Sequence, residues 1–335
     1  MGGDSTIEAA FRSGERRIWG LCYRMTGVAA DADELVQETF VKALESGRDL
    51  PGPDLERWLV RVATNLSLDR LRRRRRRRYI GPWLPSPVET AELGAGSDQA
   101  GAGYDGVSLT SDTAAGAAER LERLEQVSYA FLVALEALGP RARAALLLTD
   151  VLDYPAAEVA RVLDTSEGNV RVLRHRARRA LEGVDSALVA SPDVRQRQQS
   201  ALQKLLLCMV QQDAAGMKAL LAEDVRSITD GGGRYTALRE PLAGRQAVVR
   251  FHLETARRRA PISHTEFRWI NGAAALVVVT RPLRPQMAPR LVMRCEVDAE
   301  GRFREILTIL NPPKLTAGRF DEPVADPREI ALPPE

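Results

Sequence analysis

Lysine is almost missing from this sequence. Only four of its 48 basic residues are lysines, namely Lys42, Lys204, Lys218 and Lys314, and the rest are arginines. Arginine is therefore the default cation of the whole chain, and an arginine-rich stretch does not by itself indicate a nucleic-acid site. The seven consecutive arginines at 72–78 have to be interpreted from their surroundings.

Cysteine is equally scarce. Cys22, Cys208 and Cys295 are widely separated and form no CxxC pair, which argues against a disulfide framework or a zinc site. The N-terminal MGGDSTIEAAF lacks the apolar stretch of a signal peptide, and the longest apolar run, at 273–279, is too short to span a bilayer. We therefore expect a cytoplasmic protein, with no membrane contact, no metal and no cofactor.

What the chain does contain is typical of a soluble protein of two or three domains. It has 335 residues, of which 44% are hydrophobic and 28% charged. Residues 1–80 carry 16 basic and 12 acidic side chains, whereas residues 81–119 carry six acidic and no basic ones. This distribution indicates a polyanion-binding module followed by an acidic linker, at 81–117, which we expect to be flexible.

Residues 7–79 have helical periodicity. In DADELVQETFVKALES, Asp31 and Glu34 have the spacing of a capping box, with Asp31 as the N-cap. Its expected inner positions are Ala32, Val36, Phe40, Ala43 and Leu44. The next helix, LERWLVRVATNLSLDRLRRRRRRR, has the expected inner stripe Leu55, Leu59, Val62, Leu66 and Leu71.

Helical periodicity returns at 118–188 and contains a helix-turn-helix pattern. A short helix at 155–163 precedes a turn at Asp164 and Thr165, and Ser166 occupies the N-cap position of a second helix. The expected buried stripe of that helix is Val170, Leu173, Ala177 and Leu181. Its opposite face presents Asn169, Arg171, Arg174, His175 and Arg178. A plain helical hairpin with a charged solvent face is the alternative.

From residue 194 the pattern changes to that of an α+β domain. A long helix over 195–221 leads to AEDVRSITDGGG and then to another helix near 244–258. Strand-like runs follow, and DAEG predicts a hairpin turn between the last two of them. Helices followed by a meander of strands indicate an α+β domain at 194–315, with an irregular tail at 316–335.

The three N-terminal motifs, in this order, resemble the extracytoplasmic-function class of bacterial sigma factors. The resemblance implies a sigma domain 2 at 7–80, for core polymerase and the −10 element, and a sigma domain 4 at 118–188, for the −35 element. The implied fold is a multi-domain chain: two all-α sigma domains, the second with the helix-turn-helix, followed by the α+β domain.

The resemblance also implies residue roles. The core-polymerase-binding residues would be Asp33, Glu34, Gln37 and Glu38, although an ordinary exposed acidic face is the alternative. The DNA-binding residues would be Trp58, Arg61, Asn65 and Arg70 at the −10 element, Arg72 and Arg73 as a backbone grip, and Asn169, Arg171, Arg174, His175 and Arg178 at the −35 element. For Trp58, a place in the hydrophobic core is equally compatible with the pattern.

Three further motifs resemble signatures of a sigma group that carries a C-terminal SnoaL-like domain. The resemblance implies that this domain is an α+β cone, in which helices pack on a curved sheet. The three motifs are YIGPWLPSP, similar to WLPEP; DGGGR at 230–234, similar to DGGGK; and NPPKL at 311–315, similar to NPDKL. Ser86, Arg234 and Pro313 depart from the group's residues, which puts a salt bridge through position 86 or 313 in doubt. The implied regulatory contacts are Trp83, Pro85, Asp230, Gly231, Gly232, Gly233, Arg234, Asn311 and Lys314.

We therefore expect a sigma factor, not an enzyme, that is controlled in cis by its SnoaL-like domain and has core RNA polymerase and promoter DNA as partners. No separate anti-sigma factor is expected, and a small-molecule ligand in the cone stays open. The alternative is a helix-turn-helix regulator with a ligand-sensing or catalytic cone. In a catalytic cone, the candidates for proton transfer would be Asp230, His252 and His264.

Overall fold

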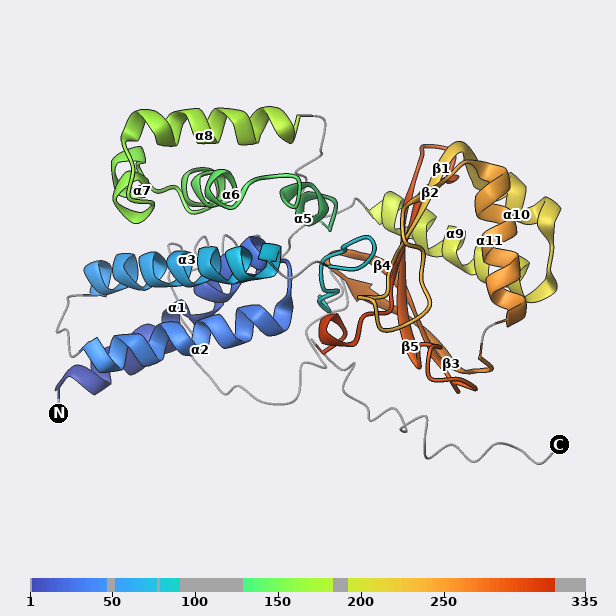
Figure 1. Cartoon of the computed structure of the whole chain (residues 1–335), viewed down its shortest axis with the longest axis horizontal. Helices are drawn as coiled ribbons and strands as arrows, with labels where there is room; N and C mark the ends of the chain where they lie inside the picture. Colours follow the sequence, from blue (N-terminus) through green and yellow to red (C-terminus); the bar gives the residue numbers. More distant parts are fainter. Residues whose placement is uncertain are drawn as a thin grey trace. The chain divides into compact units, whose positions relative to one another are not determined.

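The chain forms two compact units. The computed structural model describes residues 2–46, 52–76, 79–90, 129–182, 192–258 and 260–316 (Figure 1). The first unit comprises Met1–Arg76 and Thr90–Leu188, and the second comprises Arg77–Glu89 and Val189–Glu335. Most of the expected linker and tail, 91–117 and 317–335, lies outside the described residues. Among the helices that are described, none is both long and apolar enough to cross a membrane.

The first unit begins with three helices, α1 (Gly2–Thr26), α2 (Ala29–Ser46) and α3 (Gly52–Arg76). In α2 the expected inner residues Ala32, Val36, Phe40 and Ala43 are buried, but Leu44 is 53% exposed. Asp31 is also not the N-cap, because α2 starts two residues earlier. Its carboxylate instead accepts a hydrogen bond from Arg70, at 2.5 Å, and this partner lies 39 residues away in the sequence.

The buried face of α3 is wider than the sequence predicts. Leu55, Leu59 and Leu71 are buried as expected, whereas Val62 and Leu66 are only half-buried. Val60, Ala63 and Leu68 are buried in addition. The reason is that α3 packs on α1 and α2 and also on α6 and α7 of the same unit.

The second part of this unit contains the predicted helix-turn-helix. Its helices are α5 (Tyr129–Leu135), α6 (Pro140–Leu146), the π-helical η1 (Leu147–Val151), α7 (Ala156–Val162) and α8 (Glu167–Ala180). The turn has Asp164 at φ +48°, and the Ser166 hydroxyl accepts a hydrogen bond from the Asn169 N–H at 3.2 Å, as an N-cap should. Val170 and Ala177 are buried, and Leu173 and Leu181 are half-buried.

The second unit is the predicted α+β domain. Its helices are α9 (Pro192–Gln211), α10 (Ala214–Leu220) and α11 (Arg245–Arg258), and its strands are β1 (Leu221–Asp230), β2 (Leu242–Ala243), β3 (Ile262–Ile270), β4 (Ala273–Thr280), β5 (Arg290–Val297) and β6 (Phe303–Ile309). The single long helix expected at 195–221 is two helices, because Gln212 adopts φ +57° and Asp213 caps α10.

The sheet has the strand order β2-β1-β6-β5-β4-β3. The four C-terminal strands form the expected antiparallel meander, including the β5–β6 hairpin. Strands β1 and β2 were not predicted from the sequence. Strand β1 pairs in parallel with the distant β6 and has an irregularity between Leu221 and Arg226, so it lacks a clean alternating pattern.

The helices cover one face of this sheet and form the main core with it (Figure 1). Fully buried side chains at this contact include Leu202 of α9, Met217 of α10, Val248 of α11 and Phe303 of β6. The opposite sheet face carries Asp230 at the end of β1, because residues three apart in a strand point to opposite sides and Ser227 faces α11.

Candidate functional site

The exposed face of α2 has the acidic residues that the sequence predicts. Asp33, Glu34, Gln37 and Glu38 are all exposed. The next exposed positions along the same face are apolar: Val41 is 49% exposed and Leu44 is 53% exposed. The helical spacing from Glu34 to Val41 could have indicated this extension. An apolar patch bordered by carboxylates has the composition of a protein-binding surface.

The exposed face of α3 carries two of the four predicted −10 residues, Arg61 and Asn65, and the two predicted backbone-grip residues, Arg72 and Arg73. Arg61, Asn65, Arg72 and Arg73 are exposed, and Trp58 is half-buried, so it is neither a free surface residue nor part of the core. The guanidinium of Arg72 lies 2.7 Å from Asp69, but both side chains are about half exposed. Such a surface pair contributes little stability, so Arg72 can exchange this partner for a phosphate.

Arg70 and Arg74 differ from their neighbours, because each is held by carboxylates of the first unit. Arg70 bonds to Asp31 at 2.5 Å and to Glu34 at 2.6 Å, and it lies about 120° around the helix from Trp58. Arg74 bonds to Glu136 at 2.5 Å and donates to the Thr26 carbonyl. Within the arginine run, Arg74 therefore has structural partners, whereas Arg72 and Arg73 face solvent. The side chains of 75–78 lie outside the described residues.

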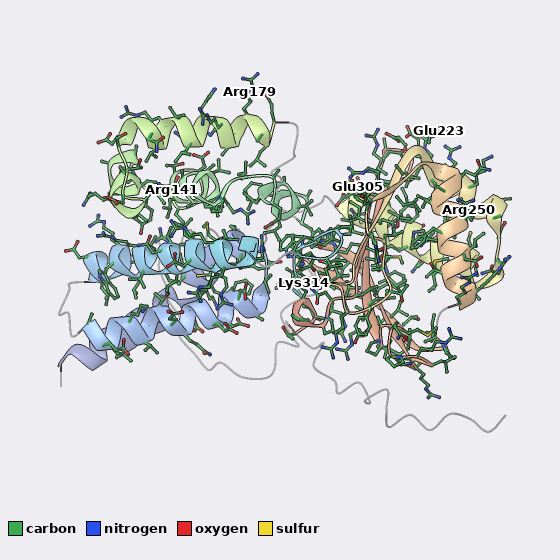
Figure 2. The ribbon with its side chains drawn as sticks, viewed as in Figure 1. Arg141, Arg179, Glu223, Arg250, Glu305 and Lys314 are labelled. Carbon is green, nitrogen blue, oxygen red and sulfur yellow. The ribbon has the colours of Figure 1, made fainter. Side chains whose placement is uncertain are left out.

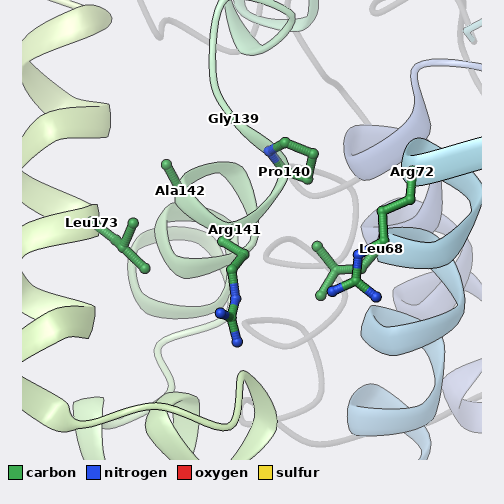
Figure 3. A pocket seen from close by; sticks show the side chains of 7 residues that line it. All are labelled: Leu68, Arg72, Gly139, Pro140, Arg141, Ala142 and Leu173. Carbon is green, nitrogen blue, oxygen red and sulfur yellow. The ribbon is translucent and has the colours of Figure 1, made fainter. Parts of the chain in front are cut away.

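The exposed face of α8 carries the predicted −35 residues. Asn169, Arg171 and His175 are exposed, whereas Arg174 and Arg178 both bond to Asp150. Beside α8, a pocket of about 330 Å³ is lined by residues of α3, α6 and α8 (Figure 3): Leu68, Arg72, Gly139, Pro140, Arg141, Ala142 and Leu173. The lining contains no carboxylate, histidine or nucleophile, so it does not have the composition of a catalytic site.

In the second unit, a buried ion pair joins three of the predicted regulatory motifs. Lys314 and Asp230 are 3% and 0% exposed, and Lys314 Nζ lies 2.6 Å from Asp230 Oδ2. The same ammonium donates to the Leu84 carbonyl at 2.5 Å, and the Leu84 N–H donates to Asp230 at 2.8 Å. The Tyr79 hydroxyl also bonds to Asp230. We call Tyr79, Asp230, Asn311 and Lys314 the anchor cluster.

Aromatic and turn residues complete the anchor cluster. The Lys314 ammonium lies 4.0 Å from the Trp83 ring centroid and 4.9 Å from that of Tyr79, a cation–π arrangement. Asn311 donates to the Tyr79 hydroxyl at 2.9 Å. A Cβ on Gly232, at φ +58°, would lie 2.5 Å from the Asn311 side chain, so this turn requires glycine. Figure 2 labels Lys314.

The other predicted regulatory residues lie around this cluster with different exposure. Pro85, Ser86 and Gly231 are buried, and Gly233 packs against Ile80. Arg234 is exposed, and its backbone N–H closes the turn by donating to the Gly231 carbonyl. Pro313 lies in the short 3-10 helix Pro312–Lys314 that presents Lys314, so the departure from aspartate places a rigid residue there.

A second contact fixes the other end of the segment 79–89. The Val88 N–H donates to the Asn271 side chain at 3.1 Å, the Asn271 N–H donates to the Val88 carbonyl at 2.8 Å, and Glu89 bridges to Ile270. Asn271 and Gly272 both have positive φ, as the two central residues of a type I′ hairpin turn do. Tyr79, Leu84 and Asn271 were not among the predicted site residues, and only Asn271 has a sequence signal, the Asn-Gly pair.

The three candidates for proton transfer do not meet in the structure. The Asp230 carboxylate is occupied by hydrogen bonds in the anchor cluster and lies on the sheet face opposite to His252. His252 is buried against Ser227, with 3.1 Å between Nε2 and Oγ, and burial lowers its pKa to about 4. The side chain of His264 is 60% exposed. This arrangement does not assemble an acid–base pair in the cone.

Comparison with known proteins agrees with these features. The Sigma-70 region 2 model matches residues 10–77, and the Sigma-70 region 4 model matches residues 128–181. The chain is 31% identical over 324 residues to the ECF RNA polymerase sigma factor SigJ of Mycobacterium tuberculosis, which covers 95% of this chain and 96% of that protein. It is 39% identical over 171 residues to SigG of the same species, covering 50% and 46%.

A solved structure is similar over nearly the full length. The crystal structure of the Mycobacterium tuberculosis extracytoplasmic function sigma factor SigJ aligns with a TM-score of 0.65 and 25% identity, covering 93% of this chain and 99% of that chain. The similarity thus includes both the helical first unit and the α+β second unit.

We predict that Lys314→Met opens the anchor cluster. The substitution leaves the buried Asp230 carboxylate without its cation, which costs about 3 kcal/mol or more. The Leu84 and Val88 amides should then exchange with deuterium about 100-fold faster. The matched control is Lys218→Met, which removes an exposed lysine of α10. Unchanged amide exchange in Lys314→Met would contradict the assigned role of the ion pair.

We also predict a pH dependence of unfolding that comes from His252. Its pKa is about 4 in the folded protein and about 6.5 when unfolded, so the unfolded state binds more protons between these values. The contribution of His252 to the free energy of unfolding is therefore fully present well above pH 6.5 and is lost as the pH falls towards 4. From pH 7 to pH 5 the loss in the free energy of unfolding should be about 2 kcal/mol greater in the wild type than in His252→Gln, as measured by urea unfolding. His264→Gln, at an exposed position, should retain the wild-type dependence; equal slopes in the wild type and His252→Gln would refute the assignment.

Proposed function

This chain belongs to the extracytoplasmic-function family of RNA polymerase sigma factors, and from that premise we propose that it binds core RNA polymerase, recognises −10 and −35 promoter elements and starts transcription. We propose further that its C-terminal domain controls this activity in cis. The observation that carries the second proposal is the anchoring of residues 79–89, directly after the −10 helix α3, in the second unit.

The surface of α2 supports the proposed contact with core polymerase. Glu34, Gln37 and Glu38 form an exposed polar face, and Val41 and Leu44 extend it with exposed apolar area. Carboxylates give orientation and partner choice, and the apolar area gives affinity when it is buried in a complex. Asp33 is oriented by a 2.6 Å hydrogen bond from the Trp19 indole.

Two surfaces of the first unit support the proposed contacts with promoter DNA. Arg61, Asn65 and Arg72 follow one exposed face of α3, and the half-buried Trp58 adds an aromatic surface for an unstacked base. Helix α8 follows a capped turn and presents Asn169 and Arg171 to solvent, as expected for a helix in the major groove.

Control in cis requires two states that differ in their contacts. We propose that one state is the anchored one, in which the segment 79–89 is held by Asp230 and Lys314. Core polymerase or a ligand would favour a second state in which this segment has other contacts. Tyr79, which bonds to Asp230, follows the last residue of α3 by three positions, so the chain itself connects the anchored segment to α3.

The alternative is a helix-turn-helix regulator that binds duplex DNA without polymerase. Such a protein would use α7 and α8 but would have no need for the acidic face of α2 or for α3. The match of region 2 to residues 10–77 therefore favours the sigma factor.

The first test is transcription in vitro with core RNA polymerase and promoter DNA from upstream of the neighbouring genes. We expect a defined transcript that depends on this protein, and a changed yield when the chain ends near residue 190 or after residue 315. The full-length Lys314→Met variant should shift the yield in the same direction as the 190 truncation, since both release residues 79–89. Wild-type yields from both truncations would rule out control in cis, and tight duplex binding with no transcript would favour the alternative.

Arg72 and Arg73 should contribute to DNA binding through phosphates. Removing both by substitution with alanine should reduce the slope of log affinity against log salt by about 1.5, because each phosphate contact contributes roughly 0.7–0.9. The measurement is the affinity of the polymerase complex for promoter DNA over a range of salt. Alanine at Arg250 and Arg304, two exposed arginines of the second unit, is the control. An unchanged slope would exclude Arg72 and Arg73 from the DNA contact.

A further inference from the structure

A single carboxylate holds two arginines of α8. Asp150 Oδ1 lies 2.5 Å from Arg174 Nε, and Asp150 Oδ2 lies 2.6 Å from Arg178 Nε. Arg174 and Arg178 are one helical turn apart, so both oxygens of one carboxylate are used. The Thr149 hydroxyl lies 2.9 Å from Asp150 Oδ1 and 2.8 Å from the Ala145 carbonyl oxygen, so its single hydrogen is shared between these two acceptors.

This contact differs from an ordinary surface ion pair. The Asp150 side chain is only 17% exposed, whereas the side chains of Arg174 and Arg178 are 40% and 58% exposed. Burial by itself raises the pKa of the Asp150 carboxyl, but the hydrogen bonds from Arg178, Thr149 and Arg174 outweigh this effect and hold the pKa below its ordinary value. The carboxylate is therefore charged at neutral pH, and its position is determined by η1, of which Asp150 is a residue.

The backbone places Asp150 where it can reach α8. Residues Leu147–Val151 form one π-helical turn, closed by a hydrogen bond from the Leu152 N–H to the Leu147 carbonyl. Single π turns inside helices are often found at functional positions.

Both arginines use the inner nitrogen, Nε, for this contact. Among the described residues, the structure shows no other hydrogen bond from these two guanidinium groups. The two terminal NH₂ groups of each arginine are the part that can bind the O6 and N7 atoms of guanine together. The contact with Asp150 thus orients each side chain and leaves its base-reading end available.

We propose that Asp150 is a positioning residue for promoter recognition: it holds Arg174 and Arg178 in the orientation in which they read guanines of the −35 element. This inference rests on the proposed function of α8 in promoter binding. An arginine loses considerable rotamer freedom when it binds a base, and Asp150 removes part of that cost in advance. Asp150 thereby increases the discrimination between a correct and an incorrect base.

The competing explanation is that Asp150 only neutralises the two arginines and competes with DNA phosphates. The two explanations predict opposite results. If Asp150 positions the arginines, its removal weakens binding to the correct −35 sequence much more than to others. If it only competes, its removal strengthens binding to all sequences alike.

The experiment uses the full-length protein with core RNA polymerase and a promoter whose −35 segment is randomised. Templates that give transcripts are sequenced, and enrichment of each base is compared between wild type and Asp150→Ala. We expect enrichment of guanine at one or two positions in the wild type and about a tenfold loss of that enrichment in Asp150→Ala. Asp150→Glu, which keeps both carboxylate oxygens, should restore part of the guanine enrichment. Asp150→Asn, which keeps one acceptor oxygen, should give an enrichment between those of the wild type and Asp150→Ala.

The control is Glu254→Ala, which removes an exposed carboxylate–arginine pair of α11, where Glu254 lies 2.6 Å from Arg258. It should leave the enrichment unchanged. No wild-type transcript would refute the proposed function, and with it this inference. Base enrichment in Asp150→Ala equal to that of the wild type, or a uniform gain in affinity, would overturn this inference alone. If Asp150→Ala does not fold, as judged by its melting curve, Asp150→Asn decides: base enrichment equal to that of the wild type would overturn the inference.

Discussion

The contact between the Lys314 ammonium and the Asp230 carboxylate determines the arrangement of the second unit around the segment 79–89. Removing both charges from water is costly, and the pair is stable only because hydrogen bonds satisfy the remaining donors and acceptors. Asp230 accepts from Tyr79, from the Leu84 N–H and from the Gly232 N–H, and Lys314 donates to the Leu84 carbonyl. The segment therefore supplies part of the solvation that the buried pair needs, which explains why segment and cone form one compact unit.

Contacts with carboxylates also distinguish the arginines of the first unit that have structural partners from those that are exposed to solvent. In a chain whose cations are nearly all arginine, charge alone does not separate a DNA-binding residue from a structural one. The hydrogen-bond and ion-pair partners of each arginine do distinguish the two kinds. Arg74 is tied to Glu136 and to a backbone carbonyl, whereas Arg73 is exposed. Arg70 is intermediate, because its contact with Glu34 links the predicted polymerase-binding face to the helix that carries the predicted −10 residues.

The sequence was informative where the signals are local. The turn at Asp164, the Ser166 cap and the buried Val170 follow from residues that are at most six positions apart, and the structure confirms them. Together with the order of the motifs, they were sufficient for the fold class. The failures involve partners that are distant in sequence. Asp31 pairs with Arg70 in place of capping α2, and Leu44 is exposed although its spacing suits a core position.

The same limit applies to the candidate site. The motifs around Asp230 and Lys314 were identified by resemblance, but the atoms that join them could not be derived from their spacing. Leu84 contributes only its backbone to the anchor cluster, so no side-chain pattern could indicate it. Strand β1 is stabilised by its parallel pairing with β6 far along the chain, and periodicity within ten residues does not contain that information.

The order of the segments along the chain has a consequence for synthesis on the ribosome. Lys314 bonds to a residue that precedes it by 230 positions, and it lies near the end of the second unit. At about 5–20 residues per second, roughly 12–46 seconds separate the synthesis of Leu84 from that of Lys314. During this interval the helices before residue 77 are complete while the segment after them has no lysine to bind. The nascent protein thus contains all of α3 well before the buried ion pair of the second unit can form.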